Sequence, residues 1–430
     1  MNFDLSPQQL ATKDAIRKFC DEKLAPIARE QDTARRYPKD IVLELGRLGF
    51  LCPIVPKEWG GGGLTSVESV IIAEELARAS AGTATMVGAH YAAAVMTLLL
   101  FGTEEQKDKY LRHLSRGEMM GAFALTERGA GSDAGGVMTL AQDQGDHWLI
   151  NGRKQWITNG NYADFYTVFC RTSDQGPRGI SAIIVPWGTE GFTRGDLEPT
   201  LGVQGSQQCE LYFHDVKVPK ENVLGGTRMT NKGFIVGMKA LDVGRIGVAA
   251  AAVGIGQAAF EASAAYAKTR KQFGQTLAEF QGIQWWLADM YTELHAARLM
   301  TFCAAAQADK GEPFTIEASM AKLYASEAAC RACDKALQIH GGYGYTKNWP
   351  VERFYRDVRI KRIYEGTTEI QRRIISREVV KKFGDYYEKY WWHGPAEDRK
   401  RGLSEISGFG THISDDQLHQ YEEMLQEFGL

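Results

Sequence analysis

The chain has 430 residues, of which 44% are hydrophobic and 24% are charged, and its formal net charge is -3. These values are typical of a globular protein with two or three domains, and they exclude the strongly basic surface of a protein that binds nucleic acid or anionic membranes. The seven cysteines are odd in number and scattered, which argues against a disulfide framework.

The N-terminus has none of the features of a signal peptide, because Asp4, Ser6 and Gln9 interrupt any apolar run. Ser6, with Pro7 after it and Gln9 three positions on, predicts the start of a helix with a capping box. We find no apolar run of about 18 residues that would cross a membrane. The sequence therefore predicts a cytoplasmic protein without a membrane span.

Residues 1–120 are predicted to form an N-terminal helical domain. Apolar residues recur there at helical spacing, and four consecutive glycines at 60–63 divide the pattern into segments. The helical runs are 41–48, 67–79 and 98–114.

Residues 121–228 are predicted to form a middle β-domain, because the period changes to short runs rich in aromatic and β-branched residues. Asn151-Gly152 separates two of these runs and predicts a tight hairpin. The runs are 147–150, 155–158, 165–170, 180–185 and 210–218.

Residues 229–384 return to the helical period and are predicted to form a helical bundle, with an alanine-rich stretch at 248–267. Cys330 and Cys333 have the spacing of half a zinc site. Because they lie inside a predicted helix with no second pair nearby, we interpret them as small apolar helix residues and expect no metal site.

Residues 385–430 are predicted to form a C-terminal extension with ten acidic and four basic side chains. Aromatic residues gather between Tyr386 and Trp392, which argues against a disordered tail. A capped amphipathic helix is predicted from Ser414 to Phe428. We expect this extension to pack on the body of the protein or on a neighbouring subunit.

The segment Ile363–Gln371 contains the strongest candidate for a catalytic group. Glu365 stands between the aromatic ring of Tyr364 and Gly366, where the backbone can approach a ligand closely. A carboxylate held against a ring and away from water has a raised pKa, which suits a general base acting on a weakly acidic C–H. By itself, a Glu-Gly pair is also an ordinary helix end or turn.

Two further segments contain residues suited to a cofactor. Gly129, Gly131 and Ser132 allow a tight loop whose N–H groups can point at a phosphate, with an ordinary β-turn as the alternative. The loop is not a Rossmann fingerprint, because no third glycine opens a helix after a strand. Trp156 and Thr158 are predicted to alternate on one strand and to face the same way, as suits a flavin ring; a core tryptophan beside a surface threonine is the alternative.

These segments, in this order, resemble the flavin-dependent acyl-CoA dehydrogenases. Residues 123–133 match the family's first signature except at Arg128, where proline is common, and residues 338–345 with Asn348, Arg353 and Asp357 match its second. The resemblance implies an α+β fold with an N-terminal α-helical domain, a middle β-barrel-like domain and a C-terminal four-helix bundle, and it implies a homotetramer.

The resemblance also implies FAD as cofactor and assigns residues to it and to the substrate. Arg270 and Gln338 match residues that reach the flavin of an adjacent subunit, and Ser132 matches a position that also touches coenzyme A. The implied FAD contacts are Phe123, Leu125, Thr126, Gly131, Ser132, Trp156, Thr158, Arg270, Phe273, Gln281, Gln338, Gly341, Gly342, Thr367 and Glu369. The implied substrate contacts are Ser132, Asp242, Arg245, Tyr364 and Gly366.

Gly244 indicates the branch of the family that the chain resembles. Some members carry their base at this position on the preceding helix, but glycine cannot abstract a proton. Of the two positions at which family members carry the base, only position 365 has a carboxylate in this chain. Its pairing with Gly244 is most similar to the short-chain and butyryl-CoA dehydrogenases.

The implied reaction is the α,β-dehydrogenation of an acyl-CoA thioester to a 2-enoyl-CoA. Glu365 would remove the α-proton while the β-hydride passes to flavin N5, and the electrons would continue to electron-transferring flavoprotein. The thioester carbonyl would lie between the Glu365 N–H and a ribityl hydroxyl. An acyl-CoA oxidase and a non-catalytic acyl-CoA- or flavin-binding subunit remain the alternatives.

The substrate is less closely defined by the sequence. The predicted helix 85–99 resembles the family's acyl-pocket helix, and Ala84 stands where glutaryl-CoA enzymes carry an arginine. His90 and Tyr91 add polar aromatic groups to this helix; we favour a core-packing role for each, with a role in the acyl pocket as the alternative. We expect a short, branched, alicyclic or aryl-substituted acyl-CoA.

Overall fold

The computed structural model describes residues 4–383. Internal contacts group the chain up to Arg372 into one compact unit, which contains every strand and every helix before α12. The predictions made for the extension 385–430 lie outside the described residues.

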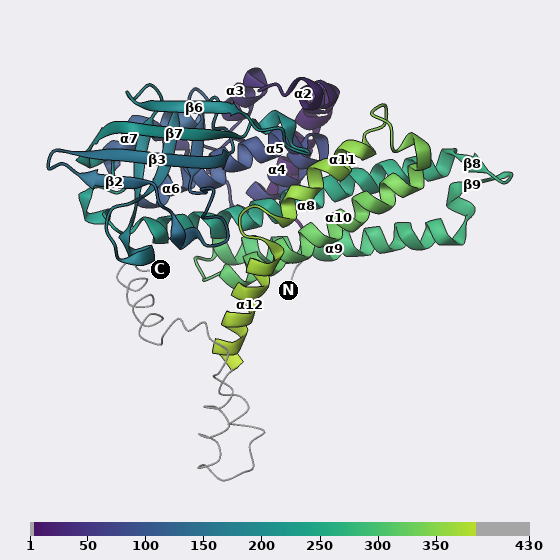
Figure 1. The fold of residues 1–430 in the computed structure, drawn as a ribbon. Helices are drawn as coiled ribbons and strands as arrows, with labels where there is room; N and C mark the ends of the chain where they lie inside the picture. Colours follow the sequence, from purple (N-terminus) through teal and green to yellow (C-terminus); the bar gives the residue numbers. More distant parts are fainter. Residues whose placement is uncertain (1–3, 384–430) are drawn as a thin grey trace, which may run out of the picture. The chain divides into compact units, whose positions relative to one another are not determined.

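Helices form the N-terminal part of the chain (Figure 1). The predicted capping box is confirmed: the Ser6 hydroxyl accepts from the Gln9 N–H, and the Gln9 side chain accepts from the Ser6 N–H. The helices are α1 Pro7–Phe19, α2 Ala28–Ala34, α3 Lys39–Arg47, α4 Ser66–Ala79, α5 Ala81–Gly88, α6 Met96–Phe101 and α7 Glu104–Ser115.

A π-helical segment, Ala89–Val95, joins α5 to α6, so residues 81–101 form one helical path. The expectation that the chain lacks long apolar runs is wrong, because Ala81–Phe101 and Gly233–Thr269 are long and apolar enough to cross a membrane. In their most apolar windows, however, 72% and 78% of the residues are buried inside the protein. This burial is what the core helices of a globular fold require.

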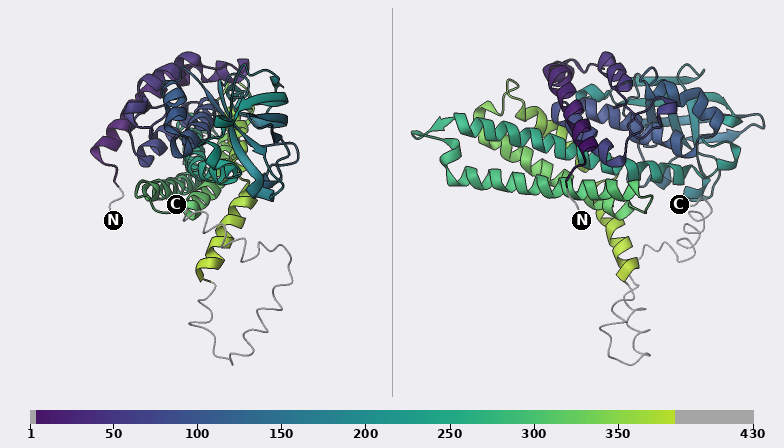
Figure 2. Two further views of the ribbon diagram at one scale, coloured as in Figure 1. Left: turned by 90° about the vertical axis from the view of Figure 1, so that its left-hand side faces the viewer. Right: turned by 180° about the vertical axis from the view of Figure 1, so that it is seen from behind.

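A curled sheet follows the N-terminal helices, which lie against one side of it (Figure 2). The strand order is β1-β4-β2-β3-β7-β6, and β5 pairs with β4 in antiparallel orientation. Every residue of β4 except the last is buried, because neighbouring elements cover both of its faces. The strands are β1 Gly121–Ala124, β2 Leu140–Asp143, β3 His147–Ile157, β4 Phe165–Arg171, β5 Ile180–Pro186, β6 Phe192–Leu197 and β7 Cys209–Pro219.

The hairpin predicted at Asn151-Gly152 is wrong. Strand β3 runs through both residues and pairs with β7, and the pairing shifts between Ile150 and Gly152. The Asn151 side chain bonds the backbone N–H and the carboxylate of Asp215 on β7. Asn-Gly therefore marks a bulge, which needs the same backbone freedom as a tight turn.

Long helices form the C-terminal part of the compact unit, and α8 packs against both α4 and α10. Cys330 and Cys333 lie inside α10 as expected, and residues 4–383 contain no cluster of three potential metal ligands. The elements are α8 Gly233–Thr269, α9 Gln281–Asp309, α10 Thr315–His340, α11 Val351–Val358, α12 Thr368–Phe383, and the strands β8 Lys271–Gln272 and β9 Gln275–Thr276.

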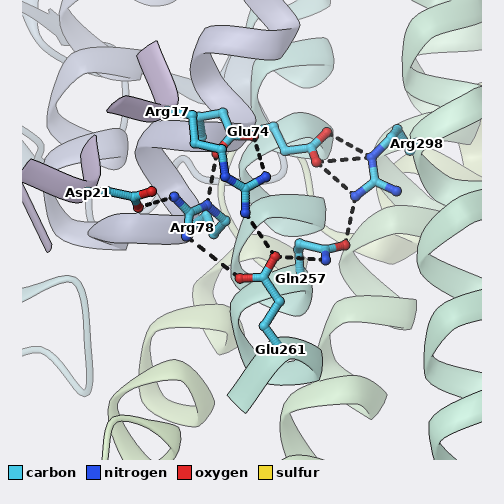
Figure 3. A network of polar contacts seen from close by, with 8 residues as sticks. Arg17, Asp21, Glu74, Arg78, Gln257, Glu261 and Arg298 are labelled. Carbon is cyan, nitrogen blue, oxygen red and sulfur yellow. Dashed lines mark hydrogen bonds and ion pairs between the residues drawn. The ribbon is translucent and has the colours of Figure 1, made fainter. Parts of the chain in front are cut away.

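A network of ion pairs links the N-terminal and C-terminal helices (Figure 3). Arg78 on α4 contacts Glu75 at 2.8 Å and Glu261 on α8 at 3.6 Å, while Arg298 on α9 donates to the Glu74 carboxylate through both Nε and Nη2. Because these arginines are largely buried, loss of their carboxylate partners would leave an uncompensated charge. The network fixes α4 and α9 against α8, the helix that carries part of the candidate site.

Candidate active site

Glu365 lies in a tight turn between the 3-10 turn Arg359–Arg362 (η12) and α12. Glu365 and Gly366 both adopt left-handed backbone conformations, with φ angles of 53° and 90°. The φ angle of Gly366 favours glycine, and a Cβ there would also lie 2.6 Å from the Gln371 side-chain nitrogen. A left-handed glutamate costs roughly 1–2 kcal/mol, a strain that persists where surrounding contacts hold the backbone in place.

The carbonyl groups of this turn receive those contacts. The Gln371 Nε2 donates to the carbonyls of Glu365 and Gly366, at 3.1 and 2.9 Å. Lys322 Nζ donates to the Gly366 carbonyl at 2.7 Å, and Arg245 Nε donates to the Glu365 carbonyl at 3.4 Å. Three side chains from α8, α10 and α12 thus fix the backbone on which Glu365 stands.

The Oε2 atom of Glu365 is buried and has no hydrogen-bond partner among residues 4–383, while the residue as a whole is partly exposed. Burial raises the pKa of this carboxyl to about 7, against the opposing positive charges of Lys322, Arg245 and Lys361. A base with a pKa near the working pH is both partly ionised and able to accept a proton. This carboxylate is therefore suited to proton transfer.

Gly244 on α8 faces the carboxylate directly. A Cβ at this position would lie 2.1 Å from Glu365 Oε2. The expectation that Gly244 offers no second base is consistent with this geometry, and the structure adds that its missing side chain provides the space for Glu365.

Asp242 and Arg245 lie one helical turn apart on α8, next to the Glu365 turn. Arg245 Nη1 donates to Asp242 Oδ1 at 2.5 Å, and the Thr315 hydroxyl donates to Asp242 Oδ2 at 2.7 Å. Both charged residues are buried. The pair orients the guanidinium whose Nε reaches the Glu365 carbonyl.

The Tyr364 hydroxyl is held by a buried lysine. Lys361 Nζ donates to the Tyr364 hydroxyl at 2.5 Å and to Thr85 Oγ1 on α5 at 3.2 Å. The structure therefore brings together Tyr364, Glu365 and Gly366 with the helix 85–99 that we expected to line an acyl pocket.

The glycine-containing loop after β1 is anchored by a buried ion pair. Lys154 Nζ contacts Glu127 Oε1 at 2.6 Å and donates to the Leu125 carbonyl at 3.1 Å. The Glu127 carboxylate also accepts the N–H groups of Met138 and Thr139, at 2.6 and 2.9 Å. Burial acts to raise the pKa of Glu127, but Lys154 and these donors hold it below its usual value. The Glu127 carboxylate, at the start of the loop, is therefore bonded to the backbone of Met138 and Thr139 at its end.

The loop and the end of β3 are neighbours, because the Gln155 N–H donates to the Thr126 carbonyl at 2.9 Å. Trp156 has a left-handed φ of 57° and is 55% exposed. The predicted regular alternation of Trp156 and Thr158 is wrong, since the strand pairing shifts between Lys154 and Ile157. The irregularity turns a large indole outward next to the loop.

The remaining loop residues leave room for a ligand. A Cβ on Gly129 or Gly131 would meet nothing within 4 Å, and Ser132 is exposed. Phe123 lies on β1 and packs against Phe169, with ring centroids 4.7 Å apart.

A second group of expected site residues lies elsewhere, at the ends of the long helices that are distant from the sheet (Figure 1). Phe273 on the β8–β9 turn is 94% exposed, and Gln281 and Gln338 are exposed as well. Arg270, Gly341 and Gly342 line a hollow together with Tyr266 and Tyr343. Within one chain, these residues are not brought to the Trp156 loop.

His90 and Tyr91 are buried core residues, as expected. His90 Nδ1 accepts the Gly121 N–H at 2.8 Å, so Nε2 carries the proton and donates to the Leu114 carbonyl at 3.0 Å. Burial lowers the pKa of His90 to about 4. This neutral imidazole joins α7 to β1.

Sequence reasoning missed the residues that support the site: Lys154, Lys322, Lys361 and Gln371. Their shared property is complete burial. Lys322 stands in an alanine-rich helical run, where a lone lysine on an apolar face is a signal that could have been noticed.

Comparison with known proteins identifies the family to which the chain belongs. The acyl-CoA dehydrogenase N-terminal, middle and C-terminal domain models match residues 6–118, 122–216 and 231–380. The chain belongs to the acyl-CoA dehydrogenase family. It is an oxidoreductase with the α+β fold expected from the sequence, and its cofactor is FAD. The boundaries expected at residues 120, 228 and 384 stay predictions.

Individual members of the family cover almost all of the described chain. The short-chain specific acyl-CoA dehydrogenase of Clostridium acetobutylicum is 42% identical over 382 residues, which cover 89% of this chain and 100% of that protein. The caffeyl-CoA reductase-Etf complex subunit CarC of Acetobacterium woodii is 44% identical, covering 88% and 99%. The structure of butyryl-CoA dehydrogenase from Megasphaera elsdenii superposes with a TM-score of 0.85 at 42% identity, covering 88% and 100%.

The residues present fit FAD. The open loop at Gly129–Ser132 can approach a pyrophosphate, and the exposed indole of Trp156 beside it can stack on a flavin ring. In the turn before α12, Glu365 Oε2 is buried without a partner in the described chain, as expected of a group that contacts a bound ligand.

Proposed function

We propose that the enzyme dehydrogenates a short acyl-CoA between Cα and Cβ, with Glu365 removing the α-proton. The observation that carries this proposal is the buried, unpartnered Oε2 of Glu365, whose pKa is raised to about 7 by burial. An α-proton next to a thioester is weakly acidic, so it requires a base of raised pKa in a water-poor site.

The fixed turn supports a second role. The backbone N–H of Glu365 would donate to the thioester oxygen and stabilise the charge that develops there, an effect typically of about 3 kcal/mol per donor. Gln371 and Lys322 support this role because they restrain the carbonyls of the same turn. Asp242, Arg245, Tyr364, Gly366 and Ser132 are proposed to contact the acyl-CoA.

When bound, FAD supplies the acceptor for the hydride that leaves Cβ. Within one chain, the residues proposed to hold it are Phe123, Leu125, Thr126, Gly131, Ser132, Trp156, Thr158, Thr367 and Glu369. Their task is to orient the cofactor and exclude water, while the redox chemistry belongs to FAD.

A second copy of the chain is proposed to complete the FAD site. Phe273 lies on the turn between β8 and β9, the two strands that Figure 1 shows far from the large sheet, and it is almost fully exposed. An exposed phenylalanine beside an arginine is suited to contact a neighbouring subunit. We propose a homotetramer in which Arg270, Phe273, Gln281, Gln338, Gly341 and Gly342 reach a neighbour's cofactor.

Electron-transferring flavoprotein is the proposed electron acceptor. The name of CarC, which is 44% identical to this chain, places that relative in a complex with Etf. An acyl-CoA oxidase, which would use oxygen instead, is the competing enzyme.

The test is anaerobic mixing of the FAD-loaded enzyme with butyryl-CoA, followed by absorbance of the flavin and by analysis of the thioester. We expect bleaching with formation of one 2-butenoyl-CoA per flavin. Rapid recolouring by electron-transferring flavoprotein, but not by oxygen, identifies a dehydrogenase. Rapid recolouring by oxygen identifies an oxidase, and failure of a panel of short, branched and ring-bearing thioesters to bleach the flavin contradicts the proposal.

A further inference from the structure

A fully buried lysine lies one turn before the proposed base. Lys361 is in η12, and its side chain is 0% exposed. Its Nζ donates to two neutral hydroxyl oxygens, that of Tyr364 at 2.5 Å and that of Thr85 at 3.2 Å. A buried ammonium is costly, so its position requires an explanation beyond packing.

The contacts of Lys361 have a defined polarity. An ammonium group only donates hydrogen bonds, so the Tyr364 oxygen accepts with a lone pair and the ring is held by its outer end. The other end of Tyr364 is joined by the backbone to Glu365. Lys361 therefore fixes the aromatic ring that precedes the base, and it links this ring to Thr85 on α5.

Three cations act on the Glu365 carboxylate, one from each surrounding element: Lys322 on α10, Arg245 on α8 and Lys361 on η12. Lys322 and Arg245 also hold the backbone carbonyls of the turn. Lys361 contacts neither carbonyl among its described hydrogen bonds. Its removal therefore leaves those backbone contacts in place.

The charged groups around Lys361 are also defined. Burial lowers the pKa of Lys361 to about 8, and the carboxylates of Asp357 and Glu365 oppose this shift. Asp357 is buried on α11, and its Oδ1 accepts the Val203 N–H at 2.6 Å. Below about pH 8, Lys361 is a cation close to the base.

We propose that Lys361 is a positioning residue for the dehydrogenation, which fixes the Tyr364 ring beside Glu365 and favours the ionised form of that base. The inference rests on the proposed function, in which Glu365 removes the α-proton. Lys361 itself takes no proton from the substrate.

The test compares Lys361→Met with the wild-type enzyme by the pH profile of kcat/KM from pH 5.5 to 9. Removal of a positive charge that acts on Glu365 raises the pKa of that carboxyl, so the acid limb should move to higher pH. A merely structural role would lower the rate without moving the limb. Lys310→Met, which alters an exposed lysine at the end of α9, should have the wild-type profile.

Two further variants keep the proposal falsifiable. Lys361→Arg retains the charge and should keep the acid limb at or below its wild-type position. If Lys361→Met fails to bind FAD, Lys361→Gln also removes the charge and should raise the acid limb in its place, and an unmoved limb there overturns the proposal. An unmoved limb in Lys361→Met, or a raised limb in Lys361→Arg, overturns the proposal. If Glu365→Gln remains fully active, the proposed function fails instead, a result that the lysine variants cannot produce.

Discussion

The Glu365 carboxylate occupies the space into which a side chain at Gly244 would project. A Cβ added to Gly244 would lie 2.1 Å from Glu365 Oε2 and 2.8 Å from its carboxyl carbon. Two carboxylates, one on α8 and one on the turn before α12, could not both be accommodated here. The absence of a side chain at position 244 is therefore a steric condition for the base at position 365.

Gly244→Ala should displace the Glu365 carboxylate and lower the rate of flavin bleaching by at least ~10²-fold, the low end for general-base catalysis. FAD content should remain normal, because the FAD contacts proposed within the same subunit lie outside α8. Stopped-flow absorbance after mixing with butyryl-CoA measures the rate.

Gly247→Ala is the matched control, since it lies one turn further along α8 and its Cβ would meet nothing within 4 Å. Alanine at an open helix position typically stabilises by about 0.5–1 kcal/mol. Gly247→Ala should therefore melt at an equal or higher temperature with unchanged bleaching. A Gly244→Ala enzyme with wild-type rates would show that the carboxylate is not confined by α8.

Glu365→Gln should stabilise the protein at alkaline pH. The folded pKa of Glu365 is about 7, compared with an ordinary 4.5, so between these values the folded state binds more protons than the unfolded state. Wild-type stability must then fall as pH rises through this range, by about 3 kcal/mol at 1.4 kcal/mol per pKa unit. Melting curves should show Glu365→Gln level with wild type at pH 4.5 and clearly higher at pH 8. Equal melting temperatures at both pH values would contradict the raised pKa.

Lys154→Met should release the cofactor loop and leave Glu127 buried without its partner. Breaking a buried pair on one side typically costs about 3–5 kcal/mol. We expect a lower melting temperature and loss of FAD. Glu127→Gln combined with Lys154→Met should recover part of the stability but not the FAD content, because the neutral amide holds the Met138 and Thr139 N–H groups less well. Full FAD content in Lys154→Met would show that the loop forms without the pair.

Trp156→Ala should weaken FAD binding without destabilising the protein from which FAD has been removed. The indole is 55% exposed, so its loss removes little core packing, whereas base-aromatic or flavin-type stacking is typically lost at a cost of about 1–3 kcal/mol. Fluorescence titration of FAD measures the affinity. Trp187→Ala, another exposed tryptophan at 43%, should bind FAD normally. Equal affinities in the two variants would remove Trp156 from the site.

The parts of the fold that depend on local sequence could be predicted. The capping box at Ser6 needs only four neighbouring residues, and the change from helical to strand period marks where the sheet begins. Asn151-Gly152 was misread because a bulge and a hairpin both need flexible backbone, and only the pairing with β7 decides between them. The strand irregularity at Trp156 likewise depends on the pairing of β3 with β7, which the local sequence does not show.

The site could be predicted only as far as its motifs extend. Glu365 follows from its neighbours in the chain, but Lys322 and Lys361 reach the site through tertiary packing, 43 and 4 positions away in the sequence. A lysine in an otherwise apolar stretch indicates burial, yet it does not show which group it will contact. The steric fit of Gly244 to Glu365 likewise requires the distance between α8 and the turn before α12.

Single-turnover bleaching of the FAD-loaded Glu365→Gln enzyme by butyryl-CoA tests the assignment of the base most directly. Glu312→Gln, an exposed glutamate after α9, is the control and should bleach at the wild-type rate. We predict that Glu365→Gln retains FAD, binds butyryl-CoA and bleaches at least ~10²-fold more slowly than wild type. Bleaching at a near wild-type rate would contradict the assignment of Glu365 as the base.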